Sequence, residues 1–167
     1  MVYIIKNKIK NKIKNIKLVI TDIDGVWTDG GLYYNDEGYA FKKFSTYDGM
    51  GVELLKKSNI ETVIISSELS KTVESRAKKL NIKYVYIGEK HKLKRIIYLS
   101  KILEIDIENI AFIGDDINDL DALKIVGLSA IPPNSPIINK FTPDYITTRS
   151  GGNGAFRDFV DLILNNI

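Results

Sequence analysis

The sequence alternates between short runs of β-branched and other apolar residues and longer segments in which apolar residues recur with helical spacing. The apolar runs predict strands at residues 17–23, 62–66, 84–87 and 110–113, with two weaker ones at 128–131 and 145–146. The predicted helices are Gly49–Lys57, Ser70–Leu80, Lys90–Leu103, Asn118–Ile125 and Ala155–Leu164. Buried strands that alternate with helices indicate an α/β fold with a right-handed, doubly wound parallel sheet. Functional sites in such sheets lie at the carboxyl ends of the strands.

One segment interrupts this alternation directly after the first predicted strand. Residues 32–44 read LYYNDEGYAFKKF, with partial alternation and a turn signal at Asn35–Gly38, which predicts an inserted β-hairpin. No internal repeat or linker divides the remainder of the chain. We therefore expect a single domain over residues 17–167, preceded by a basic lead-in over residues 1–16.

Composition narrows the chemistry that the chain can perform. It has no cysteine and one histidine, which excludes disulfides, thiolate metal sites and cysteine nucleophiles. No apolar run approaches the roughly 18 residues of a membrane span. The lysine-rich lead-in is either a nucleic-acid or membrane-binding arm or a solubilising segment, and the lack of arginine favours the second. It has no features of a secretory signal, so we expect a cytoplasmic protein without nucleic-acid or membrane partners.

Polar side chains gather at the ends of the predicted strands. Asp22 and Asp24 follow the first strand, and their spacing in an extended segment places them on one side. The ends of the next three strands carry Ser66, then Lys90 and Lys92, then Asp115, Asp116 and Asp119. Neighbouring carboxylates repel unless a divalent cation lies between them, and Mg²⁺ prefers oxygen ligands. Any single Asp could instead cap a turn, but the set as a whole predicts a phosphoryl-transfer site.

These residues resemble the four motifs of the haloacid dehalogenase-like (HAD) phosphatase superfamily. The motifs stand here as DIDG at 22–25, Ser66, Lys92 and GDDIND at 114–119. The resemblance implies a HAD-like, Rossmannoid fold, with Asp22 as the nucleophile and Asp24 as the general acid and base. It also implies that Ser66 and Lys92 bind the phosphoryl group.

The same resemblance implies Mg²⁺ as the cofactor. Asp22, Asp115 and the backbone carbonyl of Asp24 are the expected ligands. Asp116 and Asp119 are expected to hold metal-bound waters or to orient Lys92.

Longer stretches, from DIDGVWTDGGLYY to GGNGAFRD, resemble the capless branch of this superfamily. That branch contains the 3-deoxy-octulosonate (KDO) 8-phosphate and the 2-keto-3-deoxy-nonulosonate (KDN) 9-phosphate phosphatases. The short stretch between Asp24 and Asp48 leaves no room for a separate cap domain. The resemblance implies a homotetramer in which the hairpins form a central barrel and neighbouring subunits complete each site.

Four further residues bear on the substrate. Glu68 favours a nine-carbon acid, because octulosonate enzymes usually carry Arg at this place and nonulosonate enzymes Glu. We therefore expect hydrolysis of a nonulosonate 9-phosphate, such as KDN or N-acylneuraminate 9-phosphate, with KDO 8-phosphate as the alternative. Arg76 and Lys79 either bind the sugar carboxylate or belong to a solvated helix face. Arg157 is expected near the substrate if the glycine-rich tail 149–157 forms a lid rather than a linker.

A receiver-like phospho-acceptor domain is the main non-enzymatic alternative, since it also uses acids, a hydroxyl, a lysine and Mg²⁺. In a receiver the phosphorylated Asp ends a later strand than the acid pair, whereas Asp22 and Asp24 both follow the first strand here. A non-catalytic scaffold is disfavoured because all four motif positions are occupied. We therefore expect a phosphoric monoester hydrolase.

Overall fold

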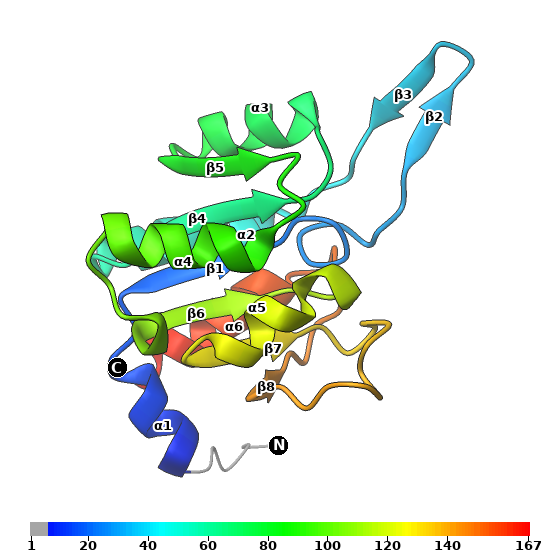
Figure 1. Cartoon of the computed structure of the whole chain (residues 1–167). Coiled ribbons are helices and arrows are strands. Elements are labelled where there is room, and N and C mark those ends of the chain that lie inside the picture. Colours follow the sequence, from blue (N-terminus) through cyan, green and yellow to red (C-terminus); the bar gives the residue numbers. More distant parts are fainter. Residues whose placement is uncertain (1–6) are drawn as a thin grey trace.

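The structure is a computed structural model that describes residues 7–167 (Figure 1). Its centre is a six-stranded parallel sheet in the order β5-β4-β1-β6-β7-β8. The strands are β1 (Leu18–Thr21), β4 (Glu61–Ser66), β5 (Tyr84–Ile87), β6 (Ile110–Ile113), β7 (Leu128–Ile131) and β8 (Tyr145–Ile146). The chain winds outward from β1 in both directions, so the prediction of a doubly wound parallel sheet is confirmed.

Helices cover both faces of this sheet. They are α1 (Asn7–Ile13), α2 (Thr46–Lys57), α3 (Lys71–Lys79), α4 (Lys92–Ile102), α5 (Leu120–Ile125) and α6 (Ala155–Leu164). The core on one face draws on α1, α2, α3 and α6, and the core on the other draws on α4 and α5. In β1, Val19 belongs to the first core, while Leu18 and Ile20 belong to the second. Both faces of this strand are buried, which is why its apolar residues run without interruption.

Several element boundaries differ from the predicted ones by one to three residues, and two of these differences have a clear local cause. β1 ends at Thr21 because the backbone turns at Ile23, whose carbonyl accepts hydrogen bonds from the N–H groups of residues 26–28. α2 begins at Thr46, earlier than expected, because the Ser45 hydroxyl caps the helix by accepting a backbone N–H hydrogen bond of 3.2 Å. Both differences arise from local hydrogen bonds that apolar periodicity does not report.

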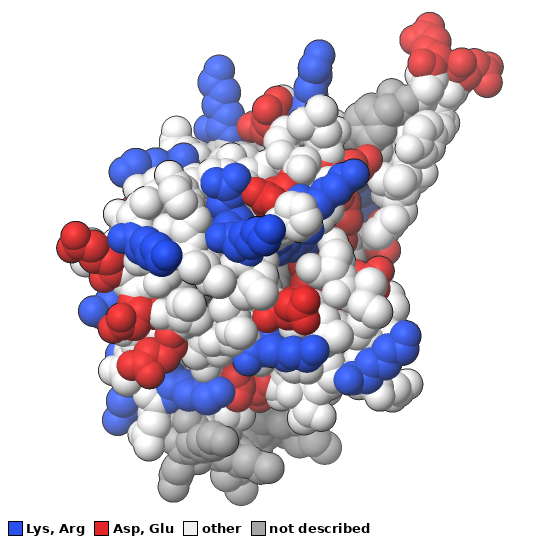
Figure 2. Space-filling view, in the orientation of Figure 1, with Lys and Arg blue, Asp and Glu red and all other residues white. Residues whose placement is uncertain are grey.

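The predicted hairpin is present as β2 (Tyr33–Asn35) and β3 (Gly38–Phe41), paired antiparallel. It projects from the body of the molecule, and the acidic residues at its tip stand clear of the surface in Figure 2. Exposed apolar side chains lie along it, among them Tyr34 and Phe41, which are 65% and 57% exposed. Between β1 and α2 the described chain forms this hairpin and no cap domain, as expected.

The basic lead-in is partly outside the described residues, since residues 1–6 are not described. Its described part contains α1, and Ile13 and Ile16 enter the core with 0% and 5% exposure. Lys12 pairs with Asp144, with Nζ 2.6 Å from Oδ1. The described part of the lead-in is therefore packed against the core through Ile13 and Ile16, which contribute buried apolar surface. None of the helices in residues 7–167 has the length and apolarity to cross a membrane.

Candidate active site

The predicted site residues meet where the central strands end. Asp22 directly follows β1, which lies between β4 and β6 in the sheet. Thr21 is in register with Ile64 and Ile113, so Ser66 and the acidic loop after β6 flank the end of β1. Strands far apart in the sequence thus deliver a hydroxyl and several carboxylates to one edge of the sheet.

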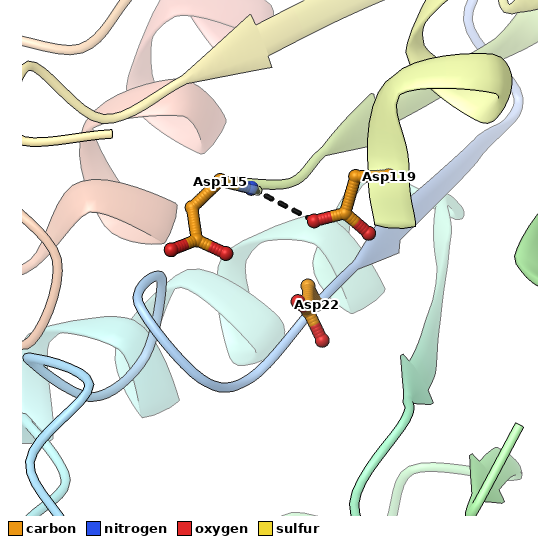
Figure 3. Close-up of side chains that lie close together, drawn as sticks. All are labelled: Asp22, Asp115 and Asp119. Atoms are coloured by element: carbon orange, nitrogen blue, oxygen red, sulfur yellow. Dashed lines mark hydrogen bonds between the residues drawn. The ribbon is translucent and has the colours of Figure 1, made fainter. Parts of the chain in front are cut away.

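Asp22, Asp115 and Asp119 form a compact cluster in which one oxygen of each lies within 4.8 Å of the others. Figure 3 shows Asp22 at the end of β1 and the other two on the segment after β6, with the Asp115 N–H donating to Asp119 Oδ2 at 2.9 Å. Gly25 permits this approach, because a Cβ there would lie 1.8 Å from Asp115 Oδ2. An oxygen-only cluster of this kind fits Mg²⁺. Asp119, expected only in a supporting role, is a direct neighbour of the two predicted ligands.

Lys92 is the cation within this cluster, and its side chain is fully buried. Its Nζ lies 2.8 Å from Asp22 Oδ2 and 2.5 Å from Asp119 Oδ1. Burial acts to lower the pKa of Lys92, but the carboxylates of Asp22 and Asp119 outweigh it and raise the pKa above its ordinary value. Lys92 is therefore an ammonium group that Asp119 holds against the side chain of Asp22. This contact agrees with the expectation that Asp119 orients Lys92.

The carboxylates carry perturbed pKa values. Burial raises the pKa of Asp22 well above its ordinary value, and the Asp119 carboxylate raises it further while Lys92 opposes. Burial, with Asp119 and Asp116, raises the pKa of Asp115 to about 7. The raised pKa values mean that Asp22 and Asp115 do not both ionise readily near neutral pH unless a positive charge lies close to them. A divalent cation supplies that charge, which is a second reason why the residues fit Mg²⁺.

A pocket of about 280 Å³ opens beside the cluster and is lined in part by Asp22, Asp24, Glu68 and Asp115. Ser66 lies next to it at the end of β4, and its hydroxyl oxygen is buried without a hydrogen-bond partner among the described residues. A buried hydroxyl without a partner is unfavourable unless a ligand completes its bonding. A phosphoryl oxygen would do so here.

Lys42 is a site residue that sequence analysis missed. It follows β3, its side chain is fully buried, and its Nζ lies 2.5 Å from Asp24 Oδ1 while also contacting Glu68 Oε2. The adjacent Lys43 is 55% exposed in its side chain. The alternation within the hairpin strand could have indicated that one of these two lysines points inward.

The sequence pattern of the haloacid dehalogenase-like hydrolase family matches residues 42–127. Over 155 residues the chain is 38% identical to the 3-deoxy-D-manno-octulosonate 8-phosphate phosphatase KdsC of Haemophilus influenzae. The aligned region covers 93% of this chain and 86% of that protein. This chain belongs to the haloacid dehalogenase-like hydrolase family. The KdsC protein of Escherichia coli K12 is 39% identical over 154 residues, covering 92% of this chain and 81% of that protein.

Solved structures agree with membership of this hydrolase family. The 3-deoxy-D-manno-octulosonate 8-phosphate phosphatase of Moraxella catarrhalis, in complex with magnesium ion, phosphate ion and KDO, matches with a TM-score of 0.92 at 41% identity, over 96% of this chain and 92% of that one. The cobalt-bound enzyme of Haemophilus influenzae matches with a TM-score of 0.88 at 38% identity, over 93% of this chain and 91% of that one. The predictions of a HAD-like fold and of a phosphoric monoester hydrolase are confirmed, and the receiver-like alternative loses its basis.

Three residues predicted to bind substrate in this hydrolase do not line the pocket of their own chain. Arg76 donates to the Ser45 carbonyl at 3.3 Å, Lys79 is exposed, and Arg157 pairs with Asp161 at 2.7 Å. Their predicted roles therefore require a neighbouring subunit.

The glycine-rich segment predicted to form a lid packs against its own chain. Gly151 lies so close to the turn after β1 that a Cβ there would be 1.9 Å from the carbonyl oxygen of Gly25. The N–H of Gly152 donates to the Val26 carbonyl at 3.1 Å. Glycine at residue 151 thus allows a close backbone approach beside the pocket, and whether the segment also covers a neighbouring site stays a prediction.

Proposed function

We propose that this protein is a Mg²⁺-dependent phosphatase that hydrolyses a 2-keto-3-deoxy sugar-acid phosphate through an aspartyl-phosphate on Asp22. The observation that carries the proposal is the position of the Asp22 carboxylate at the end of β1, with Lys92 Nζ 2.8 Å away and Asp115 beside it. A carboxylate held against an ammonium group and an oxygen-only cation site is equipped to attack a phosphoryl group.

The reaction has two steps. An oxygen of Asp22 attacks phosphorus and the bond from phosphorus to the sugar oxygen breaks, while Asp24 transfers a proton to that leaving oxygen. In the second step Asp24 takes a proton from water, the water oxygen attacks phosphorus, and inorganic phosphate leaves as the Asp22 carboxylate is restored. The hydroxyl of Ser66 donates to a phosphoryl oxygen, and the ammonium of Lys92 offsets its charge.

Mg²⁺, held by Asp22, Asp115 and the backbone carbonyl of Asp24, would neutralise negative charge on the phosphoryl oxygens. Asp119 is assigned to hold Lys92 in place, in agreement with the contact of 2.5 Å between them. Asp116 accepts the Ile117 N–H at 2.6 Å and shapes the loop that carries Asp115.

We propose KDO 8-phosphate as the substrate. The relatives from Haemophilus influenzae and Escherichia coli bear that activity in their names, and the Moraxella catarrhalis relative was crystallised with KDO. These relatives support the octulosonate alternative over the nonulosonate 9-phosphate that Glu68 favours. Glu68 does line the pocket, so it is placed to influence the choice.

The test is a screen of KDO 8-phosphate and nonulosonate 9-phosphates in the presence of Mg²⁺, compared by kcat/KM. Asp22→Asn should fold normally and lose turnover by about 10³-fold or more, since it removes the nucleophile. Asp121→Asn is the matched control, because Asp121 is 76% exposed in its side chain and pairs only with Lys124 at 3.6 Å in the described structure. Unchanged turnover in Asp22→Asn would refute the mechanism, and a preference for nonulosonates would refute the substrate.

We also propose that the protein assembles as a homotetramer whose neighbouring subunits complete each site. The exposed apolar side chains of the hairpin support an interface there, since large apolar surfaces favour association. Arg76, Lys79 and Arg157 would then act on a neighbour's pocket. Light scattering that finds only the 18.9 kDa monomer at assay concentration would contradict this assembly.

A further inference from the structure

A buried ammonium group joins two carboxylates at the mouth of the pocket. The side chain of Lys42 is fully buried, whereas the carboxylates of Asp24 and Glu68 that it contacts are 32% and 37% exposed in their side chains. Both acids line the pocket, but Lys42 does not. The direct route from Lys42 to the reaction therefore runs through the two acids that it contacts.

The three residues come from separate parts of the fold. Asp24 lies in the turn after β1, Lys42 follows the second strand of the hairpin, and Glu68 follows β4. The contacts between them thus tie the inserted hairpin to two strand ends of the central sheet. Burying a lysine is unfavourable unless its charge is paired, and both partners here are carboxylates.

Lys42 is also the closer partner of the Asp24 carboxylate. The hydroxyl of Thr28 contacts the same oxygen, Oδ1, at 3.5 Å, which is the outer limit of a hydrogen bond, against 2.5 Å for Lys42. Without the ammonium group, Asp24 and Glu68 would leave two neighbouring negative charges at the pocket mouth. Their repulsion would turn the Asp24 carboxylate away from its present position.

We propose that Lys42 is a positioning residue that holds Asp24 and Glu68 as one unit. It thereby fixes the carboxylate that transfers the proton relative to a second carboxylate that lines the pocket. The inference rests on the proposed function, in which Asp24 protonates the leaving oxygen. It predicts that Lys42 matters most for substrates whose leaving group needs a proton.

The experiment compares two substrates in the full-length protein with Mg²⁺. One is the sugar-acid phosphate with the highest kcat/KM, whose leaving alkoxide must be protonated, and the other is p-nitrophenyl phosphate, whose leaving phenolate needs no proton. Lys42→Met should lower kcat/KM for the sugar-acid phosphate by about 10²-fold or more and for the aryl phosphate by about 5-fold or less, since general acid catalysis contributes about 10²–10⁴-fold. Lys43→Met is the matched control, because Lys43 directly follows Lys42 in the chain and its own side chain is 55% exposed. This variant should keep the ratio of the two kcat/KM values within about 2-fold of the wild-type ratio.

The outcomes are distinct. Equal losses for both substrates, or no loss for either, would overturn the positioning role, since a merely structural contact does not distinguish leaving groups. If circular dichroism shows that Lys42→Met does not fold, Lys42→Gln replaces it, and the same ratio of kcat/KM values for the two substrates is measured. A wild-type protein without phosphatase activity would refute the proposed function and this inference with it, whereas an active wild type with an unchanged ratio in both Lys42 variants would refute this inference alone.

The link to Glu68 is tested by a double-mutant cycle. Glu68→Gln should change the ratio in the same direction as Lys42→Met but less strongly, because it removes one of the two charges that the ammonium group joins. The double variant Lys42→Met/Glu68→Gln should be no worse than Lys42→Met alone, since residues that act as a unit are not additive. Independent, additive losses would show that Lys42 does not couple the two acids.

Discussion

Asp48 is a buried carboxylate outside the proposed catalytic cluster, and its replacement by Asn should make folding stability less dependent on pH. The residue lies in the first turn of α2 and is 0% exposed. Its Oδ1 accepts the N–H of Arg157 at 2.9 Å, while Oδ2 is buried without a hydrogen-bond partner in the described structure. Burial raises the pKa of Asp48 from 3.8 to about 6, although the Arg157 N–H and the Arg76 guanidinium oppose the rise.

The size of the effect follows from the difference between the folded and unfolded pKa values of Asp48. Each unit of that difference corresponds to about 1.4 kcal/mol, so ionising Asp48 costs about 3 kcal/mol more in the folded protein than in the unfolded chain. Its folded pKa is the higher one, so the folded state binds the proton more tightly between pH 3.8 and about 6. The stability contributed by protonated Asp48 is therefore complete below about pH 4 and is lost as the pH rises to about 6. The amide introduced by Asp48→Asn would mimic the protonated form at every pH and still accept the Arg157 N–H.

The assay is urea unfolding of the wild type and Asp48→Asn at several values from pH 4 to pH 7, with a chelator present so that metal binding does not contribute. We expect the two to have similar free energies of unfolding near pH 4 and the Asn variant to be more stable by about 3 kcal/mol near pH 7. Asp121→Asn, which changes an exposed carboxylate, should run parallel to the wild type. The reasoning would be refuted if the free energies of unfolding of the wild type and Asp48→Asn differed by the same amount at every pH in this range. It would also be refuted if the wild type became the more stable of the two as the pH rises.

Three further predictions concern the metal site and the core. Gly25→Ala should lower kcat/KM by about 10²-fold and weaken Mg²⁺ binding in calorimetry, because its Cβ would lie 1.8 Å from Asp115 Oδ2. Gly38→Ala, which also has a positive φ (+112°), nothing within 4 Å and no part in the pocket lining, is the control for backbone strain. Ile13→Ala should lower the free energy of unfolding by about 2–5 kcal/mol in urea, whereas a change below about 0.5 kcal/mol would mean that α1 does not pack as described. Removing the metal with a chelator should abolish turnover. Adding Mg²⁺ back at about 100 times its Kd should stabilise the folded protein by about 2.7 kcal/mol in thermal melts. A melting temperature that does not change with Mg²⁺ would contradict a specific site.

Much of the site could be predicted because its residues stand at fixed places in the chain order. Asp22 and Asp24 follow a buried strand, and a parallel sheet brings the carboxyl ends of its strands to one edge whatever the loops do. Ser66, the lysines at 90 and 92 and the acids at 115–119 follow from the same rule, while the resemblance to the HAD superfamily singled out Lys92 and Asp115 among them. The contact of Lys92 with both Asp22 and Asp119 depends on this convergence and on a helix that begins at residue 92, two residues later than predicted.

The remaining features depend on contacts that no local pattern encodes. Lys42 meets Asp24 and Glu68 only because the hairpin folds back onto the sheet, 18 and 26 residues away along the chain. Ile13 and Ile16 are core residues because α1 packs against the sheet, while their Lys- and Asn-rich neighbours suggest a solvated segment. Periodicity and strand-end position are properties of the chain itself, so the sequence alone determined the sheet and its acidic edge. Which charges become paired and which apolar side chains become buried depends on how distant segments meet, and that only the tertiary structure decided.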